Sequence, residues 1–435
     1  MSHAPAPLFL RVPLQMPFLP LTVGFAEQAA LALGLGRMEA LQLTLATEEV
    51  FSYLCRVFRG GEAVELEARG GGFMVQLVFR FPYQDLDLKF FNLTADPSAD
   101  DTHDLDHLGL LLASRAVDRF FLREGEDQHL VLGLVKEKEY PPGPPQPLTA
   151  SPLAEFTVQP ITNQDLLLVP GLLASYHTHD QYPPRFSAPD RLVDMRLAGD
   201  IEGAAARDGQ DRLGGVMLWQ RRNSRLVRYF GPYLFNQPAG RDLAAALVEH
   251  FLAQVARTDA VGVFTLHATP ETPSEYFESL GEVPVCLPDR ACVIQTCQYR
   301  QIQEDPGGVV WAHPRLVPFL EEFYGNLALA RQINQVAEIT HHQPEHSVLA
   351  TVFDRPIGLV ELKPVWDGQD WSQNLAAHVA TLDGEGFTSL MCELDLAQAW
   401  QGVLGARLLD LGFVPRVVLP FGGRGDLLIL TRAAD

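Results

Sequence analysis

The spacing of apolar side chains changes several times along this chain, and each change marks a different predicted element. Alternation of apolar and polar residues is typical of a half-buried strand, whereas recurrence every three to four positions is typical of a helix. The first 140 residues contain both patterns. The elements predicted there are, in order, a strand at 8–14, helices at about 19–33 and 38–58, strands at 63–68 and 73–81 joined by Gly70-Gly71-Gly72, a helix at about 105–120 and a strand at 129–136.

A proline-rich segment separates this pattern from the rest of the chain. Tyr140–Pro152 contains six prolines, and proline joins neither a helix interior nor a central strand. Such a segment is typical of a semi-rigid spacer. A weaker break follows at Glu304–Gly308. We therefore expect four parts: a domain at 1–140, a linker at 141–152, and domains at 153–300 and 308–435.

The second and third domains end with the same predicted order of elements. Each has a helix, a strand, a second helix closed by Leu-Gly and a final pair of strands. The second domain begins with a strand at 156–161, a helix at 165–177 and a β-meander between 203 and 235. The repeated elements follow: a helix from Asp242, a strand at Val261, a short helix at 273–280 and two strands through Tyr299. The third domain begins with a helix at 314–329 and a hairpin at 348–353 and 357–362. Its repeated elements are a helix at 371–381, a strand at 389–394, a helix at 397–411 and strands at 414–419 and 426–431. This order predicts a tandem repeat of one unit.

Composition narrows the classes of function. Apolar residues make up 47% of the chain, and the net charge is −21 with a pI near 5.0. So acidic a surface argues against nucleic acid and anionic membranes as partners. With neither a membrane-spanning apolar run nor a secretion signal, the sequence predicts a cytoplasmic protein. The odd number of cysteines, five without C-x-x-C spacing, predicts reduced core thiols.

The turn Gln237-Pro-Ala239-Gly240-Arg241-Asp242 leads into the helix of the second domain. Free backbone N–H groups at a helix N-terminus hold phosphate, and small residues let the backbone approach it. Between strands at 225–235 and 260–267, this turn resembles the acyl-CoA-binding core of the GNAT acetyltransferases, whose motif is Arg/Gln-x-x-Gly-x-Gly/Ala. The likeness covers 153–300 and, more weakly, 308–435. It implies that acetyl-CoA or another acyl-CoA binds through Gln237, Ala239, Gly240, Arg241 and Asp242, the last of which replaces a small residue.

The same resemblance implies how the acyl group would be handled. The amide edge of strand 225–235 would align the pantetheine, and Gly231-Pro232 would form a bulge that splays this strand from its neighbour. In this family a Tyr is a frequent general acid. Its position is Phe277 here, so the adjacent Tyr276 is the candidate catalytic acid.

The loop at Asp180–Arg185 corresponds to the one that receives the acceptor in GNAT folds. Tyr182 and Arg185 are therefore candidate contacts to an acceptor amine or its carboxylate, with a proline-stiffened surface loop as the alternative. The third domain has Trp366–Trp371 where a pyrophosphate turn would lie, without Gly-x-Gly or a basic residue, and is expected to be a non-catalytic copy. No metal site is expected. His177-Thr-His179 has no third ligand placed by spacing, and His341-His342 with His346 sit in a polar loop before a strand.

Two segments of the first domain resemble the GHKL ATPases, most closely the anti-sigma-factor serine kinases. The run around Glu48-Glu49 resembles the helix with the catalytic acid, and His107-Leu-Gly109-Leu resembles the Gly-Leu-Gly-Leu helix under the phosphates. Tyr53 stands where that family has its magnesium-binding Asn. The family's Asp-x-Gly-x-Gly turn is replaced by Arg80-Phe-Pro-Tyr-Gln-Asp85. We expect the fold without an ATP·Mg²⁺ site, and a divergent nucleotide site is the alternative.

Together these features predict an α+β / α/β multidomain protein, with a GHKL-like α/β sandwich followed by two GNAT-like mixed-sheet units. The first hypothesis for function is an acyl-CoA-dependent N-acyltransferase with a regulatory, degenerate ATPase domain. The alternative is a non-catalytic regulator or scaffold that keeps these folds for protein binding, as in anti-sigma partner switching. A protein partner would then bind the N-terminal domain. The sequence predicts neither the acceptor nor the oligomeric state.

Overall fold

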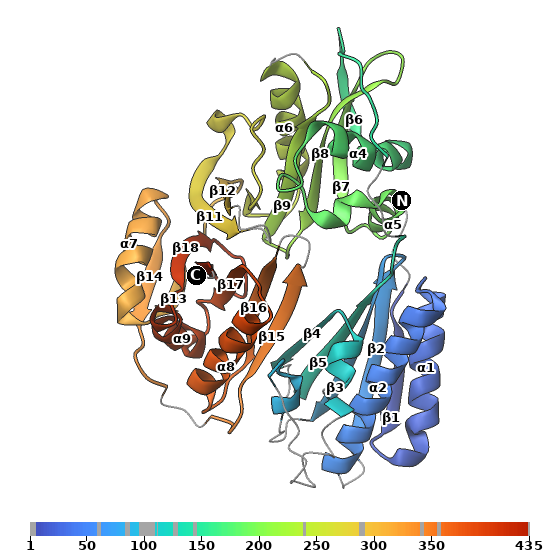
Figure 1. Cartoon of the computed structure of the whole chain (residues 1–435), viewed down its shortest axis with the longest axis vertical. Coiled ribbons are helices and arrows are strands. Elements are labelled where there is room, and N and C mark those ends of the chain that lie inside the picture. Colours follow the sequence, from blue (N-terminus) through green and yellow to red (C-terminus); the bar gives the residue numbers. More distant parts are fainter. Residues whose placement is uncertain are drawn as a thin grey trace. The chain divides into compact units, whose positions relative to one another are not determined.

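A computed structural model describes residues 6–58, 62–82, 88–94, 109–110, 112–124, 129–141, 146–237, 241–286, 292–339, 343–354 and 358–433. The chain forms two compact units (Figure 1). The first contains residues 1–139, 340–353 and 361–386, and the second contains 140–339, 354–360 and 387–435. The first unit therefore includes a piece of the third predicted domain.

The first unit is built on an antiparallel sheet with strand order β1-β2-β3-β5-β4. Gly70 and Gly71 end β2 and turn the chain into β3, as the glycine run predicts. The strands are β1 (Leu8–Pro13), β2 (Ala63–Gly71), β3 (Met74–Pro82), β4 (Arg119–Glu124) and β5 (His129–Glu137), and the helices that pack on them are α1 (Leu19–Ala32) and α2 (Arg37–Val57). Both helices were predicted, whereas β4 was not.

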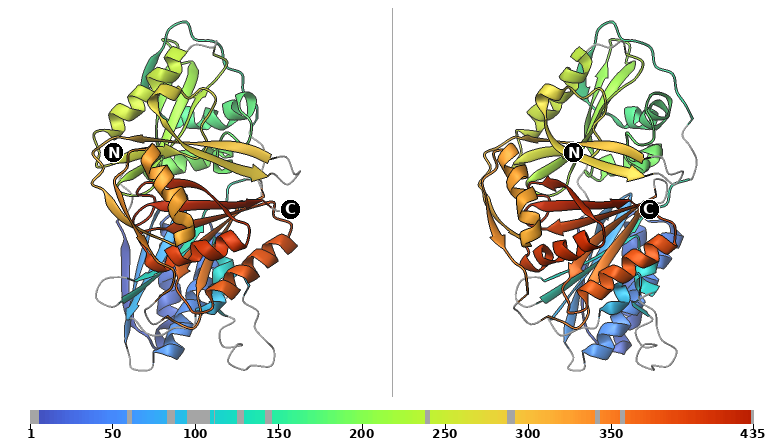
Figure 2. Two further views of the ribbon diagram at one scale, coloured as in Figure 1. Left: turned by 90° about the vertical axis from the view of Figure 1, so that its left-hand side faces the viewer. Right: turned by 60° about the vertical axis from the view of Figure 1, so that its left-hand side comes forward.

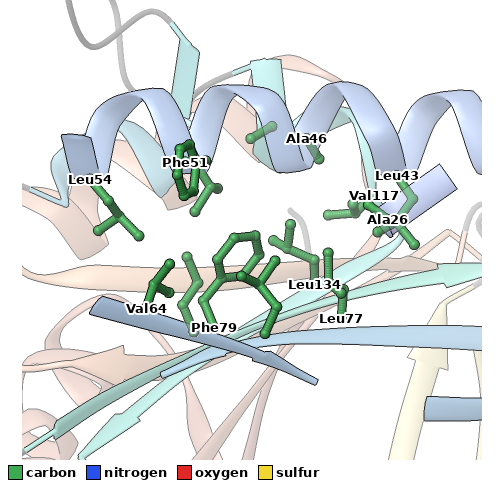
Figure 3. Packing of buried hydrophobic residues seen from close by; sticks show 14 of the residues in the cluster. Ala26, Leu43, Ala46, Phe51, Leu54, Val64, Leu77, Phe79, Val117 and Leu134 are labelled. Carbon is green, nitrogen blue, oxygen red and sulfur yellow. The ribbon is translucent and has the colours of Figure 1, made fainter. Parts of the chain in front are cut away.

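Burial of one face of α2 against this sheet makes the core of the first unit. The side chains at the centre of this core are fully buried: Leu43, Val50 and Phe51 on the helix and Leu77 and Phe79 on β3. Figure 3 shows the α2 side chains directed toward those of the strands. Each fully buried side chain of this size contributes about 1.5–3 kcal/mol relative to an exposed one.

A piece of the third predicted domain packs on this unit through a buried amide. Asn92 donates from Nδ2 to the Ser347 carbonyl at 2.8 Å and accepts the Leu349 N–H at 2.9 Å. Asn374 donates to the Ser347 hydroxyl at 2.9 Å. The elements in this piece are β15 (Val348–Asp354), β16 (Leu359–Trp366) and α8 (Trp371–Gly384).

The main sheet of the second unit has strand order β11-β12-β10-β9-β8-β7-β6. Its strands are β6 (Thr157–Pro160), β7 (Glu202–Arg207), β8 (Leu213–Arg221), β9 (Leu226–Leu234), β10 (Gly262–Thr265), β11 (Glu278–Cys286) and β12 (Cys292–Gln301). Helix α6 (Arg241–Val255) covers one face through a cluster that includes Leu247 and Phe251. The other face is covered by α4 (Asn163–Tyr176), η3 (Pro184–Ser187) and α5 (Pro189–Leu197) (Figure 1).

A second sheet has the order β15-β16-β17-β19-β18. Its remaining strands are β17 (Ser389–Asp395), β18 (Val414–Leu419) and β19 (Leu427–Ala433), with α9 (Ala399–Asp410) between β17 and β18. Beside it, β13 (Gly308–Ala312) and β14 (Arg331–Gln335) pair in parallel around α7 (Val317–Asn326). The sequence did not predict β13 and β14.

The strand order of this sheet repeats β8-β9-β10-β12-β11 of the main sheet. Each last hairpin also has an irregular step in its outer strand, between Ser279 and Gly281 in β11 and between Pro415 and Val417 in β18. The two steps meet. A Cβ added at Gly281 would lie 3.0 Å from the Arg416 carbonyl oxygen. Figure 2 shows the long β11–β12 hairpin beside the C-terminal strands. The predicted repeat is therefore supported by strand order and by the pairing of β11 with β12 and of β18 with β19.

One predicted helix is wrong. Residues 273–280 form a single 3-10 turn, η4 (Ser274–Tyr276), followed by the start of β11. Leu280 and Gly281 therefore lie inside a strand, whereas Leu411 and Gly412 follow a helix as predicted. Gly281 has φ +122°. This backbone conformation favours glycine in a strand, just as a positive φ favours it at the end of a helix. The shared Leu-Gly pair thus does not mark equivalent positions.

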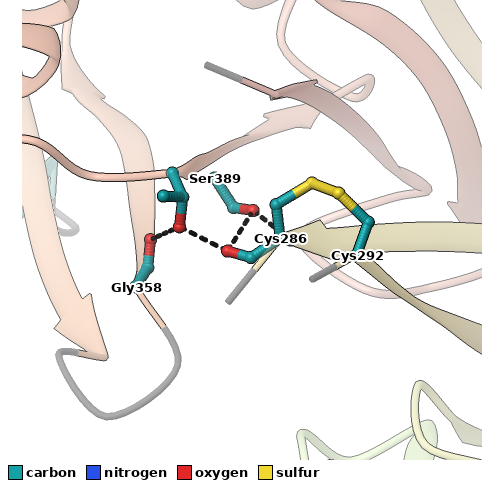
Figure 4. Close-up of a disulfide and its surroundings, with 5 residues drawn as sticks. Cys286, Cys292, Gly358 and Ser389 are labelled. Atoms are coloured by element: carbon teal, nitrogen blue, oxygen red, sulfur yellow. Dashed lines mark hydrogen bonds between the residues drawn. A yellow bond between two sulfur atoms is a disulfide. The ribbon is translucent and has the colours of Figure 1, made fainter. Parts of the chain in front are cut away.

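The prediction that all cysteines are reduced is also wrong. Cys286 and Cys292 face each other at the end of the β11–β12 hairpin and form a disulfide (Figure 4). Ser389 at the start of β17 donates to the Cys286 carbonyl at 3.3 Å and accepts the Cys286 N–H at 2.7 Å. The remaining cysteines, Cys55, Cys297 and Cys392, are free thiols.

A buried ion cluster holds β14 against the C-terminal hairpin. The Arg331 side chain is 1% exposed. It donates from Nε to Asp426 Oδ2 at 2.6 Å and from Nη1 to Asp305 Oδ1 at 3.0 Å. The guanidinium also stacks 5.0 Å from the Phe421 ring centroid. Each charge in the cluster is thus paired, as burial demands.

No helix within the described parts of the chain is long and apolar enough to cross a membrane.

Candidate functional site

The opening between β9 and β10 is the main candidate site. The two strands run parallel and pair only from Leu226 to Arg228, with Gly262 to Phe264 as partners. Beyond Arg228, β9 continues to Leu234 without a residue of β10 opposite it, among the residues the structure describes. Tyr229 to Leu234 therefore have no ladder partner on β10.

A bulge in β9 accompanies this opening. Val216 pairs with Tyr233 and Leu218 with Phe230, so β9 has one more residue than β8 over the same span. The extra step falls at Gly231-Pro232, as predicted. Gly231 has φ +91°, and a Cβ there would lie 2.7 Å from the Tyr233 nitrogen. Only glycine fits this position without strain.

Thr269, which follows β10, contacts this unpaired stretch of β9. Its hydroxyl donates to the Pro232 carbonyl at 2.9 Å, and the residue is 4% exposed. The Thr272 hydroxyl lies 3.2 Å from the Thr269 hydroxyl. The chain after β10 is thus hydrogen-bonded to β9 at Pro232.

The loop after α4 brings Tyr182 and Arg185 onto the sheet, on the face opposite α6. Tyr182 is 2% exposed and its hydroxyl lies 3.1 Å from His179 Nδ1. Arg185 donates to Gln220 Oε1 at 2.8 Å, and its guanidinium lies 5.5 Å from the Phe230 ring centroid. The loop is therefore packed against β8 and β9, and the expected alternative of a proline-stiffened surface loop does not describe it.

Two histidines lie beside this part of the sheet. His177 contacts the Leu234 carbonyl through Nε2 and Gln181 Oε1 through Nδ1, each at 3.2 Å. Burial lowers the pKa of His177, which the charge of Glu271 partly offsets. Burial lowers the pKa of His267 to about 3, and the charges of Arg228 and Arg185 act in the same direction. Both imidazoles are therefore neutral at pH 7.

The predicted pyrophosphate residues are only partly described. Ala239 and Gly240 lie outside the described residues, and for Arg241 only the backbone, which begins α6, is described. Gln237 accepts the Leu153 N–H at 3.0 Å and donates to the Phe235 carbonyl at 2.7 Å. Asp242 is exposed in the first turn of α6. Gln237 thus supports the turn from within.

Tyr276 and Phe277 lie on the α6 side of the sheet. Phe277 stacks on Tyr229 with ring centroids 4.7 Å apart. The Tyr276 hydroxyl donates to Glu249 Oε1 at 2.6 Å, and this hydrogen bond is the main reason that the pKa of Tyr276 is raised. The phenol is thus protonated at neutral pH, the form that a general acid needs.

In the first unit, two of the residues predicted from the ATPase resemblance lie against each other. Glu49 on α2 lies against Gly109, where a Cβ would collide with its carboxylate. Tyr53, at the predicted magnesium position, is 2% exposed within the core. The acidic segment at 96–106 and Asp85 lie outside the described residues.

The candidate metal positions are not brought together. His177 contacts the ring of Tyr233, whereas His179 contacts Tyr182. In the part of the chain that the structure describes, no group of three metal-ligating side chains is present.

Comparison with known proteins gives matches among solved structures alone. No family model matches the chain, and neither does any curated protein. An aminoglycoside 6'-acetyltransferase type Ii is 16% identical over 34% of this chain and 99% of its own, with a TM-score of 0.27. A phosphinothricin acetyltransferase of the GNAT superfamily from Sinorhizobium meliloti, in complex with AcCoA, is 16% identical over 35% and 90%, with a TM-score of 0.28.

A GNAT family N-acetyltransferase from Escherichia coli in complex with CoA is 17% identical over 36% of this chain and 86% of its own, with a TM-score of 0.26. About a third of the chain is thus similar to acetyltransferases of this superfamily. Because these TM-scores are low, the similarity carries no argument for activity. None of these three structures is an ATPase or an anti-sigma factor.

Sequence reasoning missed Arg228, His267 and Thr269. Arg228 interrupts an otherwise apolar strand, Leu226–Phe230, which is a signal that was available. His267 and Thr269 follow a strand that is buried along its length, where a chain leaving the sheet often carries functional side chains.

Proposed function

We propose that the second unit is an acyl-CoA-dependent N-acyltransferase, and that its donor binds in the opening between β9 and β10. The observation that carries this proposal is that the parallel pairing of β9 with β10 stops after Arg228, with a bulge at Gly231-Pro232 and a helix that begins at Arg241. An extended, amide-containing chain such as pantetheine could pair with the part of β9 that has no ladder partner on β10.

The two ends of the donor would then meet different groups. The pyrophosphate lies at the start of α6, where free N–H groups and the helix dipole favour an anion. The thioester lies at the inner end of the opening, where a carbonyl oxygen can accept from a strand amide. Acetyl-CoA is the simplest such donor, and ATP has no part in this site.

The transfer needs one bond to form and one to break. The neutral acceptor amine attacks the thioester carbonyl and the C–N bond forms. The nitrogen then loses a proton to water, the C–S bond breaks, and the sulfur leaves as a thiolate that takes a proton. We assign the proton donor as Tyr276. Its hydroxyl would give up its hydrogen bond to Glu249 and donate to the leaving sulfur instead. Replacing Tyr276 by Phe should lower kcat without changing the Kd for acetyl-CoA.

Calorimetric titration with acetyl-CoA tests the proposal, and the Asp242→Gly variant sharpens it. Asp242 places a negative charge beside the proposed phosphates, and its removal should tighten binding by about 1 kcal/mol, roughly fivefold in Kd. Asp190→Gly is the matched control, because Asp190 is also exposed in the first turn of a helix, α5. The control should leave the Kd unchanged.

If neither the wild type nor Asp242→Gly binds millimolar acetyl-CoA, the acyltransferase proposal is wrong. The second candidate, a protein-binding regulator of the anti-sigma type, is favoured by a specific feature of the first unit. Met38, Leu41 and Leu45 form one exposed stripe on α2, at 64%, 58% and 41% exposure. A protein partner would cover this stripe, while the filled space between Glu49 and Gly109 would keep ATP out.

A further inference from the structure

A hollow of about 250 Å³ lies beside the last turn of α6, on the face of the main sheet that this helix covers. The pairing of the strands sets its floor. Glu202 on β7 stands opposite Trp219 on β8, and Arg221, two residues farther along β8, stands opposite Val227 on β9. Residues that pair across antiparallel strands share a face, as do residues two apart on one strand. All four side chains therefore lie on the α6 side of the sheet.

The floor of the hollow is apolar and its rim is charged. Trp219 and Val227 are 6% and 2% exposed, and Val255 on α6 closes the floor at 2%. Glu202 and Arg221 on the rim are exposed, as is Arg257, which follows α6. A ligand in this hollow would place an apolar group on the tryptophan, and its ends would meet charges of both signs.

The rim charges are available to a ligand. Within the described parts of the chain, the side chains of Glu202, Arg221 and Arg257 form neither a hydrogen bond nor an ion pair. Asp200, which also lines the hollow, already accepts from Gln220 Nε2 at 2.8 Å. Glu202 is therefore the carboxylate that a ligand's ammonium group would meet, and the two guanidinium groups would meet a ligand's carboxylate.

The size of the hollow limits the ligand. Its volume equals that of about eight water molecules in the liquid. Sites for drug-sized ligands are larger, at about 300–1,000 Å³. A ligand that carries a single charge would leave the opposite charge of the rim unmet. These properties together favour a compact zwitterion with an apolar group.

We propose that this hollow binds a free α-amino acid with an apolar side chain. The side chain lies on Trp219, the ammonium group pairs with Glu202, and the carboxylate pairs with Arg221 and Arg257. The site goes beyond the proposed acyl transfer, because it needs no acyl-CoA. It also lies outside the stretch of β9 proposed for the donor, which begins at Tyr229.

Leucine and its single-charge analogues test the proposal without any acyl-CoA. The probes are L-leucine, isoamylamine, which lacks the carboxylate, and isocaproate, which lacks the ammonium group. Each is titrated into the full chain by ligand-observed NMR. Leucine should bind about fivefold more tightly than either analogue, as expected for ion pairs at an exposed rim. Glycine should bind at least about tenfold more weakly than leucine, because it brings no apolar side chain to the floor.

Substitutions at the rim should have opposite effects on the two analogues. Glu202→Gln should weaken leucine and isoamylamine about fivefold and should not weaken isocaproate. Arg221→Met should weaken leucine and isocaproate about fivefold and should not weaken isoamylamine. The matched controls are Glu278→Gln, at the start of β11, and Arg212→Met, just before β8. Both residues are exposed and do not line the hollow, so neither control should change any Kd.

A blocking variant shows whether leucine occupies this hollow. Gln254 lines it from α6, and Gln254→Trp would fill the space without changing a charge. Leucine binding should then be lost while thermal unfolding stays cooperative. The site is wrong if folded Gln254→Trp still binds leucine, if the three probes bind equally, or if none binds at millimolar concentration. If Gln254→Trp does not fold, the opposite effects of Glu202→Gln and Arg221→Met decide.

The outcome is independent of the proposed acyl transfer. If acetyl-CoA binds and leucine does not, the amino-acid site is wrong and the acyltransferase proposal stands. If leucine binds with the expected dependence on Glu202 and Arg221 and acetyl-CoA does not bind, the amino-acid site stands and the transfer is wrong.

Discussion

The connection β9–α6–β10 and the connection β16–α8–β17 occupy the same place in two copies of one strand order, yet their helices begin differently. At the start of α8, Asp370 accepts the Ser347 N–H at 2.6 Å, and Asp367 accepts from Trp371 Nε1 and from the Gly368 N–H. At the start of α6, the one acidic side chain, Asp242, is exposed.

The difference shows how a fold can keep its shape while losing a binding site. Carboxylates of the chain itself occupy the N-terminal region of α8, so no phosphate could enter without meeting two negative charges. The connection to the last hairpin differs as well, with a single turn, η4, in the first copy and the helix α9 in the second. Shared topology therefore says nothing about shared chemistry.

The largest expected effect is a loss of stability on breaking the buried ion cluster beside the second copy. Replacing Arg331 by Met leaves Asp305 and Asp426 buried without a counter-charge, and should lower the free energy of unfolding by about 3–5 kcal/mol. Urea denaturation measures it. Arg315→Met is the control, because Arg315 pairs with Asp410 on the exposed surface, and its loss should be much smaller. Equal losses would show that the Arg331 cluster is not buried as described.

The next effect compares the two Leu-Gly pairs. Gly281 and Gly412 have φ +122° and +83°, so an alanine at either strains the backbone by about 1–3 kcal/mol. Gly281→Ala should cost more, because its Cβ would press on the Arg416 carbonyl, whereas the nearest atom to a Cβ at Gly412 is a flexible arginine side chain. Thermal unfolding of both variants measures the two losses of stability. A larger loss for Gly412→Ala would contradict the contact between β11 and β18.

The disulfide offers a third test, since no disulfide lies among the described residues of the second copy. Closing its short loop should stabilise the fold by about 2 kcal/mol in the chain-entropy model. Cys292→Ser and mild reduction should both remove this amount. Thiol titration of the unreduced, denatured chain should find the thiols of Cys55, Cys297 and Cys392, and all five cysteines should react after reduction.

A further expected effect is a dependence on pH that belongs to the first copy. Because folding lowers the pKa of His267 from about 6.5 to about 3, the unfolded chain binds the proton first as the pH falls. The contribution of this histidine to the free energy of unfolding is therefore fully present above pH 6.5. It falls by about 1.4 kcal/mol for each pH unit below that value. His267→Gln should flatten this slope between pH 6.5 and 5, and the exposed His129→Gln should not.

Sequence alone predicted most elements because their apolar periods were long and unambiguous, as in α2 and α6. It failed where tertiary contacts decide. Residues 273–280 read as a helix, but Phe277 stacks on Tyr229 and the following residues pair with β12. The disulfide was missed because spacing cannot show that Cys286 and Cys292 lie opposite each other in a hairpin.

The candidate site was predictable only in outline. Gly231-Pro232 indicated a bulge because glycine and proline interrupt a strand in recognisable ways. The packing of Arg185 on Phe230 could not be predicted, because it depends on how the loop after α4 packs on the sheet. The turn residues Ala239 and Gly240 stay a prediction.

The contact between Gly281 and Arg416 joins the two copies through equivalent irregular steps of β11 and β18. A homodimer joined this way repeats every substitution on both sides of its axis. In a single chain each substitution occurs once. One half can therefore keep an open strand pair while the other gives up its site to its own carboxylates, and the interface between them is preserved.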